Sequence, residues 1–450
     1  MTAIPAAEVT GLLVALIRNR CVNDGTPDSG HEHRSVETIE SYLGRRGRRF
    51  EPHPGRQSVL YRIPGTCSDA PSLMLLGHTD VVPVTAAGWS VDPFEGLRSN
   101  GFVWGRGAVD MLNQTASMAA VFRRFLDGEV PPPTGDLLFL AVADEEAGGK
   151  LGAAYLADHH WDEVGCDYVL TEIGAPMLAG TAGPALPVTV AEKGPHWRTF
   201  RVRGIPGHGS QPYGTRNALV PLAEAITRLA EVPAPILISD EWRAFVAAWE
   251  PEPELAADLV DPERVDAAVD RIAESDPGFA RWVHACTHLT ISPNTLHAGV
   301  KANVVPDEAV AEIDVRMLPG QETADLLDHF RKVIGPDVED LLEITEIEST
   351  LANGSPPEGP LWDAIGDSLA ETAGHRRLLP TLIPVATDAR FFRRRGTIAY
   401  GMAVFDDQVG FGDLLSMFHG HDERVSEASL GLTAAHLLAT VRRFFELTSP

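Results

Sequence analysis

Three short apolar strings in this chain each run directly into histidine or acidic residues, and this pattern constrains the fold most. They are residues 73–77 before His78 and Asp80, residues 137–143 before Asp144, Glu145 and Glu146, and residues 168–171 before Glu172. Strings of this length, separated by helical patterns, are typical of buried strands in an α/β domain whose sheet is covered on both faces. Ligands bind outside the carboxyl ends of such strands, so we expect these polar side chains to share one site.

The pattern changes near residue 194, where a second kind of architecture begins. Residues 196–204 and 305–318 alternate between polar and apolar side chains, which predicts a smaller α+β domain with one exposed sheet face. After about residue 350 the α/β pattern resumes. We therefore expect a large domain built from residues 1–193 and 350–450, a smaller inserted domain built from residues 194–349, and within it an acidic, mostly helical insertion at about 238–292.

Charge and cysteine usage narrow the class of protein. Lys and Arg number 37 against 63 Asp and Glu, which gives a formal charge of −26 in 450 residues. This balance argues against nucleic-acid partners and against binding to anionic membranes, and no apolar run is long enough to span a bilayer. The first 20 residues read as an amphipathic helix rather than a signal peptide. The 4 cysteines are far apart in the sequence, which favours a reducing, cytoplasmic location.

Five motifs carry a resemblance to a known family. In chain order they are GHTDVVP (77–83), WGRGAVDM (104–111), ADEEAGG (143–149), TEIG (171–174) and HGHDERV (419–425). With RGIPGHGSQP (203–212) in the smaller domain, this set resembles the M20 family of metallopeptidases and aminoacylases. The resemblance implies a zinc-peptidase-like α/β catalytic domain with a central mixed sheet and an inserted α+β lid or dimerisation domain.

The same resemblance implies a centre for two metal ions. His78 and Glu172 would hold one ion, Glu146 and His419 the other, and Asp110 would bridge both. Imidazole and carboxylate ligands without thiolates suit Zn²⁺ and leave room for water and substrate. We expect two Zn²⁺ ions per chain, with Co²⁺ or Mn²⁺ as alternatives.

Two further residues near the metals have implied roles. Asp80 would orient the imidazole of His78, as carboxylates beside metal-bound histidines commonly do. Glu145 matches the general base of the family, which takes a proton from the attacking water and passes it to the departing amine.

The smaller domain supplies the remaining expected site residues. His208 matches a lid histidine that, in dimeric relatives, reaches the active site of the partner subunit. Asn303 and Arg316 match lid residues that hold a substrate carboxylate, for which a guanidinium is a natural receptor. A homodimer formed through the lid is therefore possible, although monomeric relatives exist.

Some histidine and serine patterns have rival interpretations. His421 is an alternative metal ligand to His419. His284 and His288 have the spacing of a zinc-binding helix, but no glutamate base lies between them, and we interpret them as ordinary helix residues. Ser210 is not in a GxSxG motif, which argues against a serine hydrolase.

These observations predict a cytoplasmic, dinuclear zinc amidohydrolase that acts on short peptides or N-acyl amino acids. A non-catalytic descendant that binds a metabolite is the main alternative, and a metallophosphatase is a weaker one. The sequence does not separate carboxypeptidase, dipeptidase, aminoacylase and deacylase activities.

Overall fold

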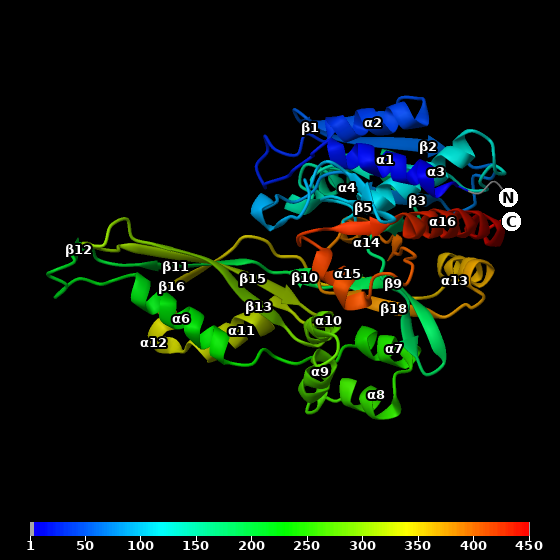
Figure 1. Cartoon of the computed structure of the whole chain (residues 1–450). Coiled ribbons are helices and arrows are strands. Elements are labelled where there is room, and N and C mark those ends of the chain that lie inside the picture. Colours follow the sequence, from blue (N-terminus) through cyan, green and yellow to red (C-terminus); the bar gives the residue numbers. More distant parts are fainter. Residues whose placement is uncertain (1–3, 450) are drawn as a thin grey trace.

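The computed structural model describes residues 4–449, and the two largest sheets among them differ in size (Figure 1). The large sheet takes its strands from residues 48–192 and 353–401, and the small sheet takes its strands from residues 194–346. In Figure 1 the small sheet extends away from the large one as a long arm.

The large sheet is mixed, as expected for the fold class. Its main path runs β1-β2-β6-β3-β7-β19-β9-β17, with β8 and β18 also paired to β9. The strands are β1 (Arg48–His53), β2 (Arg56–Ile63), β3 (Leu73–His78), β6 (Leu137–Val142), β7 (Tyr168–Thr171), β8 (Leu178–Gly180), β9 (Gly183–Glu192), β17 (Asn353–Gly354), β18 (Leu378–Ile383) and β19 (Ile398–Gly401). β3 lies between β6 and β7 and is parallel to both, whereas β2 pairs antiparallel with β6.

Helices cover both faces of the large sheet, which explains why its central strands are apolar throughout. Leu73 and Leu75 of β3 belong to one hydrophobic core, and Met74 and Leu76 belong to the core on the opposite face, because successive strand side chains point to opposite sides. The first core contains residues of α1 (Ala6–Arg18), α2 (His33–Leu43), α3 (Leu112–Leu126), α13 (Pro360–Ala373) and α16 (Glu427–Leu447). The second contains residues of α4 (Ala153–His159), α5 (Trp161–Val164) and α14 (Ala389–Arg393).

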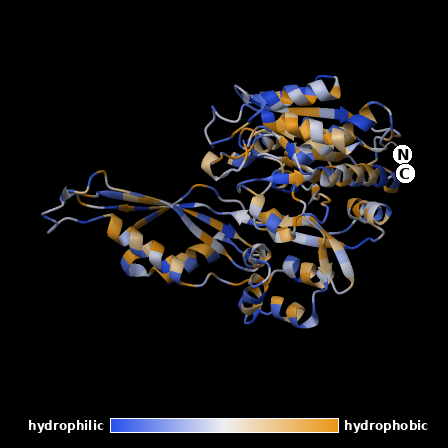
Figure 2. Ribbon diagram, in the orientation of Figure 1, coloured by the Kyte–Doolittle hydropathy of each residue, from blue (hydrophilic) through white to orange (hydrophobic). Residues whose placement is uncertain are grey.

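The small sheet has a core of its own on one face. Its strands are β10 (Gly194–Pro195), β11 (Arg198–Arg203), β13 (Thr290–Ala298), β15 (Glu308–Met317) and β16 (Leu342–Glu346). Alternate residues of β15, from Ala309 to Met317, are buried against α6 (Leu219–Glu231), α11 (Thr323–Ile334) and α12 (Pro336–Glu339). Figure 2 shows hydrophobic and hydrophilic residues mixed along these elements, as expected for one packed and one exposed face.

The helical insertion packs against the large sheet, although in sequence it lies between strands of the small sheet. It forms α7 (Asp240–Trp249), α8 (Pro253–Leu259), α9 (Val265–Ala273) and α10 (Pro277–Thr287). Its buried aromatic residues, including Trp242, Phe245 and Trp282, belong to the core of the large sheet and not to that of the small one. The insertion lies within the smaller domain in sequence, but its apolar face is buried against the core of the large sheet.

Short elements complete the chain. They are β4 (Leu97–Ser99), β5 (Phe102–Trp104) and β20 (Arg424–Ser426) in a three-stranded sheet, β12 (Gly207–His208) paired with β14 (Val304–Val305), α15 (Phe411–Met417), and the 3₁₀ turns η1 (Ala86–Gly88) and η2 (Glu145–Ala147). Among residues 4–449, no helix combines the length and the hydrophobicity that crossing a membrane requires.

Candidate metal centre and active-site cavity

The three strands that end in histidine or acidic residues have their carboxyl ends at one edge of the large sheet, as the sequence predicts. β6, β3 and β7 are parallel neighbours, so their carboxyl ends lie at the same edge of the sheet. His78 is the last residue of β3, Glu145 and Glu146 follow β6, and Glu172 follows β7. Ligand atoms of His78, Glu145 and Glu172 lie within 4.8 Å of one another, as do those of His78, Asp110 and Glu146.

Asp110 lies between two histidines. Its Oδ1 is 3.3 Å from Nε2 of His78, and its Oδ2 is 3.2 Å from Nε2 of His419. The outer partners complete the arrangement: Glu172 Oε2 is 3.5 Å from the His78 nitrogen, and Glu146 Oε2 is 3.1 Å from the His419 nitrogen. The structure therefore brings together all five expected metal ligands, in two groups that share one carboxylate.

Burial and mutual repulsion perturb the ionisation of these groups. Burial raises the pKa of Glu146 to about 7, and the negative charge of Asp110 acts in the same direction. Burial also raises the pKa of Glu172. Burial alone would lower the pKa of His419, but its hydrogen bonds to Asp110 and Glu146 raise it to about 10. A cluster of buried carboxylates of this kind attracts cations.

A buried ion pair fixes the backbone beside the shared carboxylate. Glu423 accepts hydrogen bonds from the backbone N–H groups of Gly107 and Asp110 at 3.0 Å each. It also pairs with Arg106, at 2.8 Å from Nη1 to Oε2. Glu423 comes from the same motif as His419, so one segment supplies both a candidate ligand and the support for Asp110.

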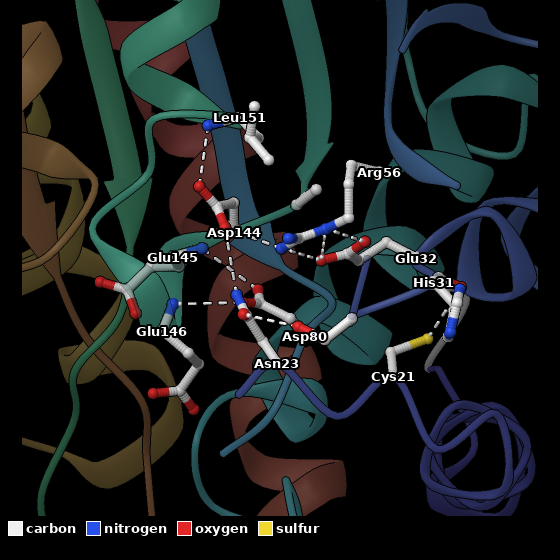
Figure 3. A network of polar contacts seen from close by, with 12 residues as sticks. Cys21, Asn23, His31, Glu32, Arg56, Asp80, Asp144, Glu145, Glu146 and Leu151 are labelled. Carbon is white, nitrogen blue, oxygen red and sulfur yellow. Dashed lines mark hydrogen bonds and ion pairs between the residues drawn. The ribbon is translucent and has the colours of Figure 1, made fainter. Parts of the chain in front are cut away.

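Asp80 contacts more than the His78 ring (Figure 3). His78 Nδ1 lies 3.0 Å from the backbone oxygen of Asp80 and 3.6 Å from its carboxylate. The carboxylate oxygens accept hydrogen bonds from the backbone N–H groups of Glu145 at 3.2 Å and Glu146 at 3.1 Å, and from Asn23 Nδ2 at 2.8 Å. Asp80 therefore lies where it can support both the histidine and the two glutamates.

Next to Asp80 lies a buried charge network that no sequence motif indicates (Figure 3). Arg56 binds Glu32 through Nε and Nη2, at 2.9 Å and 2.8 Å, and donates from Nη2 to Asp144 Oδ1 at 2.7 Å. Asn23 also donates to Asp144, at 3.2 Å. Arg56 and Glu32 are 24 residues apart, and Arg56 and Asp144 are 88 residues apart, so no local motif marks them as partners.

Gly30 permits this close packing. Its φ of +79° lies in the left-handed region, which glycine adopts at little cost. A Cβ atom at this position would lie 2.4 Å from Glu32 Oε1 and 2.7 Å from Arg56 Nε. The network thus depends on a residue without a side chain.

Glu145 faces the cavity next to these ligands. It lines the cavity together with Asp110, Glu146, Glu172 and His419. Burial and the charge of Glu172 raise its pKa well above the usual range. Arg390, another residue without a signal in the sequence, has its Nη1 atom 4.0 Å from Glu145 Oε1 and donates to the backbone oxygen of Gly148 at 3.2 Å.

The cavity has a volume of about 730 Å³ and combines this polar floor with apolar walls. Arg316 lines it, as expected, but its Nε and Nη2 atoms donate to Asp314 at 2.8 Å and 3.1 Å. The two residues are two positions apart on β15 and share one face of the sheet. That spacing is the signal that could have predicted the pair. Arg281 of α10, which lies outside every sequence motif described above, lines the same cavity.

His208 and Asn303 do not line this cavity. His208 lies in β12 and its Nδ1 is 2.7 Å from Ser210 Oγ, while the backbone oxygen of Asn303 accepts a hydrogen bond from Gly209. In Figure 1 the label of β12 lies at the far end of the small sheet. Within this chain these two residues are therefore apart from the metal ligands.

The rival histidines have other surroundings. The ring of His421 lies beside Gly88, where a Cβ atom would be 2.3 Å from its Nε2. His284 and His288 stack on each other with ring centroids 3.9 Å apart, and His288 Nε2 is 3.0 Å from Asp266 Oδ1. Among residues 4–449, neither His284 nor His288 belongs to a cluster of metal-ligating side chains.

Comparisons with known proteins agree with this geometry. The model of peptidase family M20/M25/M40 matches residues 74–443. Aminoacylase-1B of Rattus norvegicus is 27% identical over 411 residues, covering 89% of this chain and 87% of that protein. The N-fatty-acyl-amino acid synthase/hydrolase PM20D1 of Mus musculus is 27% identical over 380 residues, covering 82% of this chain and 74% of that protein.

A solved structure confirms the fold class. The M20 family metallo-carboxypeptidase Sso-CP2 from Sulfolobus solfataricus superposes with a TM-score of 0.73 at 17% identity, covering 98% of this chain and 99% of that one. The likeness in fold extends over both sheets.

Proposed function

Because the chain belongs to peptidase family M20/M25/M40, we propose that it is a dinuclear zinc amidohydrolase that cleaves the amide bond of short peptides or N-acyl amino acids. Membership confirms the resemblance seen in the motifs and the expected class of hydrolase. The position of Asp110 between His78 and His419 is the observation that carries the dinuclear assignment.

The residues present fit a pair of metal ions. His78 and Glu172 would hold one ion, Glu146 and His419 the other, and Asp110 both. Glu146 Oε1 is buried without a hydrogen-bond partner among the described residues, as expected of an atom that a cation would satisfy. The donor set of nitrogen and oxygen atoms suits Zn²⁺, and also Co²⁺ or Mn²⁺. Bound ions would activate water and polarise the scissile carbonyl.

Glu145 is the proposed general base. Its side chain is 11% exposed and lines the cavity next to the ligand Glu146. Among residues 4–449 its ion-pair partner is Arg390, at 4.0 Å. Its carboxylate takes a proton from the attacking water and delivers it to the leaving nitrogen. Asp80 holds the backbone of Glu145 and Glu146, so it is a positioning residue for both.

The substrate class rests on the named relatives and on the cavity. One relative is named an aminoacylase, and the other is named a synthase/hydrolase of N-fatty-acyl-amino acids. The cavity of about 730 Å³ has room for a short peptide or an N-acyl amino acid and places apolar walls beside the polar floor. We keep a cytoplasmic location as part of the proposal, because all 4 cysteines are free.

His208 and Asn303 of the smaller domain lie apart from the metal ligands of their own chain. His208 and Asn303 would contribute to catalysis from a second copy of the chain, bound through the smaller domain formed by residues 194–349. Sedimentation of the purified protein tests this: a dimer supports it, and a monomer with full activity refutes it.

The central test combines metal analysis with an assay. We expect about two zinc ions per chain and hydrolysis of N-acyl amino acids or dipeptides that a chelator abolishes and added Zn²⁺ restores. Two metals with activity only toward phosphate esters would favour a metallophosphatase. Metal-free protein without activity would favour a metabolite-binding descendant.

A further inference from the structure

One face of helix α10 forms a wall of the active-site cavity. Gly278, Arg281, Trp282 and Ala285 all line the cavity. Residues three, four and seven positions apart lie on the same side of an α-helix. This helix belongs to the insertion at about 238–292, so the insertion contributes a continuous surface to the site.

This wall is firmly attached to the segment that carries His419. A Cβ atom on Gly278 would lie 2.5 Å from the backbone oxygen of Gly412 in α15, so the two helices touch through their backbones. The rings of Phe279 and Trp282 pack on Phe411, with centroids 5.2 Å and 5.5 Å apart. α15 ends at Met417, two residues before His419. The α10 wall therefore keeps a fixed place relative to the metal ligands.

Three arginines line the cavity, and they differ in their pairing. Arg390 donates hydrogen bonds to the backbone oxygens of Thr387 at 2.8 Å and Gly148 at 3.2 Å. Arg316 of the small sheet already binds Asp314 through Nε and Nη2. Arg281 is exposed at the cavity. It makes no hydrogen bond or ion pair with any residue in the described part of the chain. A guanidinium left without a carboxylate in a chain of net charge −26 is available to an anionic ligand.

We propose that Arg281 is the receptor for the free carboxylate of the substrate. The proposal rests on the amidohydrolase function proposed above and names which side of the cavity holds the charged end. The same cavity offers apolar lining for a bulky uncharged group, including the edge of Trp282, which is 4% exposed, and Val385, which is 38% exposed. The favoured substrates are amides with a free carboxylate and an aromatic or large aliphatic group.

Binding measured without turnover gives the most direct test. In the Glu145→Ala protein, isothermal titration calorimetry would compare N-acetylphenylalanine with its uncharged amide. We expect Arg281→Ala to weaken binding of the acid about 10- to 100-fold, which corresponds to about 1.4 to 2.8 kcal/mol. Binding of the amide should change less than about threefold, since a charge-assisted hydrogen bond requires the carboxylate. Arg281→Lys should recover part of the loss.

Two control variants separate this role from others. Arg243→Ala removes an exposed arginine of α7 in the same insertion that does not line the cavity, and we expect it to leave both affinities unchanged. Arg316→Ala tests the other candidate receptor. If Arg316→Ala produces the loss specific to the acid and Arg281→Ala does not, the proposal is wrong.

The remaining outcomes separate this proposal from the proposed function. Equal weakening of the acid and the amide by Arg281→Ala would overturn the carboxylate role. Failure of the Glu145→Ala protein to bind the acid would also overturn it. In either case, chelator-sensitive hydrolysis of amides by the wild-type protein would leave the amidohydrolase function standing.

Discussion

Replacement of Arg56 by methionine should destabilise the protein strongly. Arg56 is 1% exposed and binds two buried carboxylates, Glu32 and Asp144, at 2.8 Å and 2.7 Å from its Nη2 atom. Methionine has a similar length but leaves both acids without their cation. Removal of one partner from a buried ion pair costs about 3–5 kcal/mol in free energy of unfolding, and we expect a loss in this range.

The pH dependence of this loss provides an internal check. Burial, together with the charge of Asp80, raises the pKa of Glu32 to about 7 even while Arg56 lowers it. Without Arg56 the pKa of Glu32 rises further. Above about pH 4.5, Glu32 therefore keeps its proton in the folded protein but has lost it in the unfolded chain. Stability then falls as the pH rises through this window. We expect Arg56→Met to cost more at pH 8 than at pH 5.5.

Urea denaturation followed by far-ultraviolet circular dichroism would measure both effects. Arg98→Met is the matched control, because Arg98 pairs with Glu427 at 2.9 Å while 53% of its side chain is exposed. Such surface pairs contribute about 0–1 kcal/mol. A second variant, Arg56→Met with Glu32→Gln, should recover part of the loss. If Arg56→Met costs no more than the control at pH 8, the reasoning about the network is refuted.

Three further predictions concern catalysis, metal binding and acid stability. Glu145→Ala should lower kcat about 10²- to 10⁴-fold while elemental analysis still finds the metals; retention of more than a tenth of wild-type kcat would contradict its role as general base. Zn²⁺ added to metal-free protein at about 1,000 times its Kd should stabilise the fold by about 4 kcal/mol for each occupied site, and an unchanged Tm in differential scanning calorimetry would speak against a site in the folded state. His436 is buried in α16, and burial lowers its pKa to about 4. Between about pH 4 and 6.5 this histidine is protonated in the unfolded chain but not in the folded protein. The free energy of unfolding therefore falls as the pH drops through this range. His436→Leu should remove about 3 kcal/mol of this acid-induced loss, as measured by urea denaturation at pH 7 and pH 4; equal losses in both proteins would exclude His436 as the cause.

The central strands and the ligand cluster were predictable because their signals are local. The string at residues 137–142 is entirely apolar and forms β6, which is buried on both faces. The polar residues that follow such strands meet at one edge because parallel strands share a direction. His78, Glu146 and Glu172 therefore came together as expected, whereas Asp110 and His419 were expected only from the family resemblance of the motifs.

The supporting network and the packing of the insertion were not predictable in this way. Asn23, Glu32 and Arg56 precede the motifs, and their contacts with Asp80 and Asp144 depend on how distant segments pack. The insertion at 238–292 has amphipathic helices, but periodicity shows only that a face is buried and not which core it joins. In the structure Trp242 and Trp282 join the core of the large sheet.

The backbone contact between Gly278 and Gly412 has a consequence for how the specificity of this protein can change. The aromatic face of α10 anchors the helix, whereas Arg281 and Ala285 project toward the cavity. Exchange of these two side chains leaves the anchor and the metal ligands untouched. Selection can therefore change what the site accepts without disturbing the reaction it performs, and a library restricted to positions 281 and 285 is a compact route to altered specificity.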